Sequence, residues 1–277
     1  MIASQAPAAF AGAPLFEPVA GLLSRFPDAL PSPAQLTALL GQIAPDARSG
    51  SGRPIRFTLP PAELPAYEQH IHTTGAVPTR ADNWHDFFNA LAWCVWPQTK
   101  AACNSLHLRE QQARAAACLT SRGPVRDALT QFDECGVLVI STDPHIPALL
   151  AAHEWEAAFW QQRARLIDTT RFLIFGHGTW DQLRQPYFGL CAKAIYRVVE
   201  ADWLTLPATD QQTEADAWLA RRLTDPQHPF GKADLSPLPL LGIPGLTPAN
   251  ETPDYYRDTR QFRPWRVADR IAEQREL

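Results

Sequence analysis

The chain has 277 residues and a formal net charge of −4, with 45% hydrophobic and 19% charged residues. Such a composition excludes intrinsic disorder, and the length suits one large domain or two small ones. The acidic balance argues against general nucleic-acid binding, which needs a basic surface to displace counterions. No apolar run approaches the roughly 18 residues of a membrane-spanning helix. We therefore expect a folded protein with no nucleic-acid partner and no membrane span.

The five cysteines are odd in number, and no two of them are spaced as C-x-x-C. This pattern predicts neither a disulfide framework nor a cysteine-rich zinc site, and it is typical of proteins from a reducing compartment. We predict a cytoplasmic protein without structural disulfides. The sequence does not indicate an oligomeric state.

The N-terminal part is rich in proline and alanine and ends in a flexible Ser-Gly-Ser-Gly sequence. We therefore predict an N-terminal segment over residues 1–52 and a single domain over residues 53–277. The first expected elements are a helix over 33–43 with Ser32 as its N-cap, a strand over 53–59 and a helical stretch over 62–71.

The hydrophobic pattern is densest after residue 79. Asp82 or Asn83 can cap a helix over 84–95, and Pro97 suits the first position of a second helix that runs to about residue 119. The segment that follows is interpreted as a β-hairpin, in which Gly136 supplies the positive φ of the turn. Its two strands are expected over 125–132 and 137–141.

The remaining elements alternate without a regular order. We expect a long helix over 147–167 that buries Ala152, Trp155, Phe159 and Leu166, strands over 171–175 and 193–200, and a helix from Asp210 that ends before Asp225. The proline-rich tail from residue 235 is expected to lie over the body as extended chain. The mixture predicts an α+β fold, with a small sheet that contains the hairpin and with Pro-rich N-terminal and C-terminal segments wrapped on the body.

The stretch over residues 78–93, PTRADNWHDFFNALAW, resembles a bacterial family that is catalogued as domain of unknown function 3025. The resemblance implies a bacterial protein and kinship over about residues 53–266, and it implies no particular activity. It continues through Pro97, Lys100, Asn104, His107, residues 122–134, 175–177, 238–245 and 250–264.

Two polar helix faces form the first candidate site. Residues four apart share one face of a helix, so polar side chains at this spacing gather on one side. If the two helices pack as a hairpin broken at Pro97, their polar faces meet and could bind a divalent metal, hold an anion or exchange protons. The same side chains could instead fix helix packing through hydrogen bonds. They are His85, Asp86 and Asn89 on the first helix and Lys100, Asn104 and His107 on the second.

Three further residues belong to the candidate site. Asp133 and Glu134 fall at the predicted hairpin turn, and carboxylates near a strand end hold Mg²⁺ or Mn²⁺ in many enzymes. Acidic residues in a turn are also commonly just solvated. His177 stands between two glycines after the predicted strand over 171–175, so we expect its imidazole to reach a cleft or solvent. A turn histidine bonded to the backbone is the alternative.

These residues support the hypothesis of a metal-assisted hydrolase that acts on a small anionic substrate. The alternative hypothesis is a non-catalytic binding or scaffold protein whose polar helix faces only fix packing. Under the enzyme hypothesis, the catalytic residues are His85, Asp86, His107 and His177. The ligands of a divalent metal are drawn from His85, His107, His177, Asp133 and Glu134, and the substrate-binding residues are Arg80, Asn89, Lys100 and Asn104.

Overall fold

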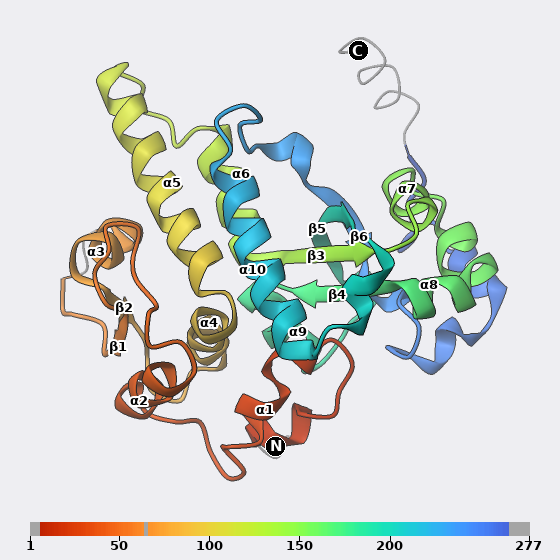
Figure 1. The fold of residues 1–277 in the computed structure, drawn as a ribbon, viewed down its shortest axis with the longest axis horizontal. Helices are drawn as coiled ribbons and strands as arrows, with labels where there is room; N and C mark the ends of the chain where they lie inside the picture. Colours follow the sequence, from red (N-terminus) through yellow and green to blue (C-terminus); the bar gives the residue numbers. More distant parts are fainter. Residues whose placement is uncertain (1–5, 64–65, 266–277) are drawn as a thin grey trace.

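A four-stranded mixed sheet forms the centre of the computed structural model, which describes residues 6–63 and 66–265 (Figure 1). The central strands run parallel and both outer pairs are antiparallel. Every residue of the strand over 136–141 is buried, so the middle of the sheet is covered on both faces. Across the sheet, the strands are β4 (Thr170–Ile174), β3 (Gly136–Ser141), β5 (Cys191–Val198) and β6 (Ser236–Pro239).

The longer helices pack around this sheet and against one another. Figure 1 shows the longest of them, in yellow, extending away from the body toward its C-terminal end. Packing joins α4 to α9, α5 to both α6 and α10, and α6 to α9. These helices are α4 (Trp84–Val95), α5 (Pro97–Ala116), α6 (Pro124–Cys135), α9 (His177–Leu183) and α10 (Ala208–Thr224).

A smaller unit precedes them in the chain. It holds a parallel pair of short strands with helices beside it. Ser32 caps its second helix, because the hydroxyl accepts from the Gln35 backbone N–H while the Gln35 side chain accepts from the Ser32 N–H. The elements are α1 (Ala20–Leu23), α2 (Pro33–Ile43), β1 (Arg56–Thr58), α3 (Tyr67–Thr74) and β2 (Ala76–Pro78).

The N-terminal segment packs on the body, as the sequence predicts. The Trp180 indole donates to the Leu15 carbonyl at 3.0 Å, and the Phe16 ring lies 6.0 Å from the Phe88 ring. The α+β class is therefore confirmed, with one small mixed sheet surrounded by helices. In the described part of the chain, no helix combines the length and the apolar character needed to cross a bilayer.

The predicted hairpin over 125–141 is wrong in its first half. Residues 124–135 form helix α6, and the buried residues Ala128, Leu129 and Phe132 lie on one face at a helical spacing. Gly136 has a φ of −72°, so it does not supply a left-handed turn. Its role is steric, because a Cβ at Gly136 would lie 2.4 Å from the Phe132 carbonyl oxygen. Strand β3 pairs instead with β4 and β5, which come later in the chain.

The long helix predicted over 147–167 is broken. Its first part is α7 (His145–Ala151), and the chain then turns at His153, whose φ is +58°. A π-helical turn over Ala157–Gln161 and helix α8 (Arg163–Thr169) follow. Of the four positions expected to be buried in this segment, three are, and Ala152 is exposed.

Several other predicted elements are confirmed with small shifts. Asn83 caps α4, and Pro97 is the first residue of α5, which ends at Ala116 rather than near residue 119. The strands predicted over 171–175 and 193–200 correspond to β4 and β5. Helix α10 begins after Pro207, so Asp210 lies in its first turn and does not cap it.

Candidate metal centre

The first candidate ligand, His85, lies in the first turn of α4. This helix begins there because the Asn83 side chain accepts from the Asp86 backbone N–H at 2.9 Å. Asp86 accepts from the backbone N–H, Nε and Nη2 of Arg80. Although burial opposes ionisation of Asp86, these hydrogen bonds from Arg80 lower its pKa. The Asp86 carboxylate is thus bonded to Arg80. His85 lies beside Glu134 at the end of α6 and His177 at the start of α9.

Glu134 and His177 are brought together by two glycines. A Cβ at Gly176 would lie 2.3 Å from the Gly136 backbone nitrogen, and one at Gly178 would lie 2.8 Å from Glu134 Oε2. A side chain at position 176 would therefore clash with the backbone of Cys135 and Gly136, and one at position 178 would displace the Glu134 carboxylate. The two glycines of the Gly-His-Gly sequence therefore allow the start of α9 to lie close to the end of α6.

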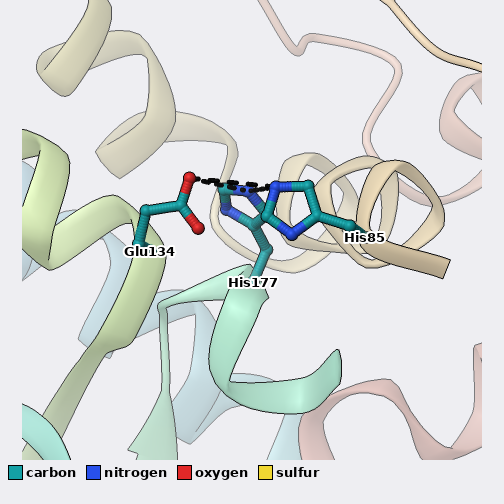
Figure 2. Close-up of side chains that lie close together, drawn as sticks. All are labelled: His85, Glu134 and His177. Atoms are coloured by element: carbon teal, nitrogen blue, oxygen red, sulfur yellow. Dashed lines mark hydrogen bonds and ion pairs between the residues drawn. The ribbon is translucent and has the colours of Figure 1, made fainter. Parts of the chain in front are cut away.

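The three side chains converge from three different helices (Figure 2). Nε2 of His85 and Nε2 of His177 are 3.1 Å apart, and Glu134 Oε1 lies 3.8 Å and 3.7 Å from them. A point equidistant from the three atoms lies about 2.1 Å from each, which is the length of a zinc–nitrogen bond. Within residues 6–63 and 66–265, this is the one cluster of three such side chains close enough to hold a metal ion.

The protonation of His177 suits metal binding. Burial lowers the pKa of His177 to about 3, against an opposing effect of Asp133, so its imidazole is neutral at physiological pH. Burial raises the pKa of Glu134, and His85 acts in the opposite direction. The side chains of His85 and Glu134 are 36% and 46% exposed, whereas that of His177 is 5% exposed. The cluster is therefore closed on the His177 side and open to solvent on the other.

Asp133 lies next to this cluster but points elsewhere. Its Oδ1 accepts from Lys100 Nζ at 2.5 Å, and its Oδ2 lies 3.7 Å from Nδ1 of His177. Burial opposes its ionisation, but Lys100 and then His177 bring the pKa of Asp133 below its ordinary value. Lys100 also donates to Asn89 Oδ1 at 2.9 Å, so the polar faces of α4 and α5 do meet, as the sequence predicts. His85 of the same α4 face turns to His177 instead.

The other two polar residues of α5 lie deeper. Asn104 donates to the carbonyl and the carboxylate of Glu68 and accepts from the Gly50 N–H. His107 is 3% exposed, and burial lowers its pKa to about 4. It lines a cavity of about 10 Å³ together with Lys100, Asn104, Asp133, Tyr67 and Glu68. This volume suits about one water molecule.

Two residues that hydrogen-bond to this polar interior, Tyr67 and Glu68, are not among the predicted site residues. The Tyr67 hydroxyl accepts from Asn89 Nδ2 at 2.9 Å, and Glu68 accepts from Asn104. The available signal was helical periodicity, because Tyr67, Glu68 and Ile71 share one face of the helical stretch expected over 62–71. Only Ile71 of the three is buried, and the pattern alone indicates no chemistry.

The chain matches one known family of proteins. A family model described as Protein of unknown function (DUF3025) matches residues 55–266. The chain belongs to this family. The DUF3025 region contains His85, Glu134 and His177, and it starts after the Pro-rich N-terminal segment. No curated protein and no solved structure is similar to the chain.

Proposed function

We propose that the chain is a metal-dependent hydrolase whose divalent ion is held by His85, Glu134 and His177. The observation that carries the proposal is the triangle of donor atoms, with sides of 3.1, 3.7 and 3.8 Å. Two imidazoles and one carboxylate are the protein ligands of many catalytic zinc sites, which keep a fourth position open. Here the exposed side chains of His85 and Glu134 leave that position facing solvent.

A bound ion would act as a Lewis acid and would lower the pKa of a coordinated water. The protein's own residues set the geometry around it. His177 is buried in the interior, and the Glu134 carboxylate packs against Gly178. His85 supplies the third donor from the first turn of α4.

Arg80 is the best candidate to bind an anionic substrate. It precedes α4, and its guanidinium is 60% exposed. Asp86 occupies its Nε and Nη2, which leaves further N–H donors for a carboxylate or a phosphate. Lys100, Asn89 and Asn104 are buried and bonded within the protein, so a substrate would reach Arg80 more easily.

Metal binding is the first test. Purified protein is loaded with Zn²⁺, Mn²⁺ or, without oxygen, Fe²⁺, and the affinity is measured by calorimetry. We expect one ion per chain. We also expect a loss of affinity of about 100-fold or more in His85→Ala and His177→Ala. Removal of a residue that only hydrogen-bonds to a metal ligand already lowers the affinity by about 10- to 100-fold. His228→Ala, at an exposed histidine paired with Asp225, is the control and should bind as the wild type does.

Hydrolysis of a panel of phosphate esters, carboxylic esters and amides then tests the reaction class. The same donor set holds Fe(II) in oxygenases, so selective binding of Fe²⁺ together with oxygen consumption would contradict the hydrolase proposal. An unchanged affinity in both histidine variants, or no binding by the wild type, would support the scaffold hypothesis.

A further inference from the structure

Behind the candidate metal centre, a line of polar side chains continues from the buried His177 through the protein to Tyr67, which is 36% exposed. It begins at Nδ1 of His177, which faces Asp133 Oδ2 at 3.7 Å. Asp133 Oδ1 accepts from Lys100, Lys100 donates to Asn89, and Asn89 donates to the Tyr67 hydroxyl. The line thus joins α9, α6, α5, α4 and α3, and Lys100 and Asn89 are both buried within it.

The two nitrogens of His177 have different surroundings. Nε2 belongs to the donor triangle with His85 and Glu134, and Nδ1 is buried and faces the Asp133 carboxylate on the other edge of the ring. A neutral imidazole carries its proton on only one nitrogen, and the partner of one nitrogen decides the state of the other. A carboxylate at Nδ1 favours the Nδ1–H tautomer. The lone pair is then at Nε2 and points to the metal position.

Asp133 cannot itself bind the ion that His177 would hold. One of its oxygens is taken by Lys100, and the other lies at the Nδ1 edge of the ring, away from the donor triangle. Its neighbour Glu134 points to that triangle because consecutive helical residues project about 100° apart. The two adjacent acids therefore have separate tasks, one at the metal position and one behind it.

We propose that Asp133, oriented by Lys100, is a positioning residue that holds His177 in the tautomer required for metal binding. This inference rests on the proposed metal site and adds the residues that prepare it. Metal-bound histidines commonly donate their second N–H to a carboxylate, and loss of that partner weakens metal binding by about 10- to 100-fold.

Asp133→Asn is the sharpest test, because Lys100 dictates how the amide lies. Lys100 has only donors, so it keeps the amide oxygen and turns the amide NH₂ toward His177. The NH₂ would donate to Nδ1 and would favour the Nε2–H tautomer, which blocks the metal position. We expect a 10- to 100-fold loss of Zn²⁺ affinity by calorimetry. We also expect the proton of His177 to move to Nε2 in long-range ¹H–¹⁵N spectra of the metal-free protein.

Asp143→Asn is the matched control. Asp143 is a partly buried acid paired with Arg165 at 2.6 Å, and it takes no part in the donor triangle. The same chemical change there should alter neither the Zn²⁺ affinity nor the His177 tautomer.

The main-chain carbonyl of Asp133 is the competing acceptor, since it also favours a proton on His177. If that carbonyl orients the ring, Asp133→Asn will keep the Nδ1–H tautomer and the full affinity, and the proposal is overturned. An Nε2–H tautomer in the metal-free wild type would overturn it as well, even if the variant fails to fold. A wild type that shows Nδ1–H but binds no metal would contradict the metal site, and the tautomer in Asp133→Asn would then decide whether the carboxylate positions His177.

Discussion

The polar interior between α3, α4, α5 and α6 differs sharply from a groove on the other side of α5. The groove has a volume of about 1260 Å³ and is lined by residues of the N-terminal segment, α8, β4 and α10, among them Leu22, Ile167, Phe172 and Leu173. The cavity of the polar interior measures only about 10 Å³. No residue of the donor triangle lines the groove.

The larger of the two regions is not the one beside the potential metal ligands. The groove is where largely apolar surfaces of several segments meet without filling the space, and the charged residues that line it, such as Glu17, Arg171 and Asp216, belong to no cluster of potential metal ligands. In the polar interior, buried groups constrain one another through short contacts, and at its edge three potential metal ligands lie within reach of one ion. Converging donor atoms with shifted pKa values indicate a functional site more strongly than a large volume does. If the groove carried the function instead, substitutions in the polar interior would change folding alone.

The largest effect on stability should come from Lys100→Met. Lys100 is 6% exposed and pairs with Asp133, whose side chain is 18% exposed, so the loss of Lys100 leaves an uncompensated charge that is largely shielded from solvent. We expect a decrease of about 3–5 kcal/mol in the free energy of unfolding, measured with urea. Arg171→Met removes a cation from the groove, where Arg171 bonds only main-chain carbonyls, and should cost far less. An equal decrease in the free energy of unfolding in Lys100→Met and Arg171→Met would show that charges in the polar interior are no more tightly coupled than those in the groove.

A pH-dependent effect should follow from His107. Burial lowers the pKa of His107 to about 4. Between about pH 6.5 and 4, the imidazole is therefore protonated in the unfolded chain and neutral in the folded protein. Stability should therefore fall as the pH drops from about 6.5 to 4. In His107→Gln, up to about 3 kcal/mol of this fall should disappear. Urea unfolding at several pH values measures how steeply the free energy of unfolding changes with pH in the wild type and in His107→Gln. Parallel slopes for the variant and the wild type would show that His107 is protonated in the folded protein.

The smallest effect is expected from Gly178→Ala. The new Cβ would lie 2.8 Å from Glu134 Oε2 and 2.9 Å from the Glu134 carbonyl, so the carboxylate must move. We expect Zn²⁺ affinity to fall about tenfold, at the lower end of the effects of misplaced ligands. Gly41→Ala is the control, because a Cβ there meets nothing within 4 Å and a helical alanine should stabilise α2. Unchanged affinity in Gly178→Ala would mean that Glu134 is not held by this contact.

Local signals in the sequence are enough to predict many of the elements. Ser32 and Asn83 cap their helices, Pro97 starts α5, and the apolar runs near 171–175 and 193–200 become β4 and β5. These features depend on neighbours within a few residues, and such interactions can be read along the chain. The hairpin prediction failed because a short segment of mixed polarity next to a glycine fits both a strand and a helix. The burial of Ala128, Leu129 and Phe132 on one face distinguishes the two.

The residue types of the site were also visible in the sequence, since His85, Glu134 and His177 all stand among the predicted metal ligands. What the sequence could not tell is which of the five candidates meet. His85 and His177 are 92 residues apart, and their contact depends on how α4 packs against α9. Asp133 and Glu134 are neighbours, yet one faces Lys100 and the other faces the histidines. Tertiary packing decides this because a helix projects consecutive side chains about 100° apart, and only the surrounding helices determine what each of them meets.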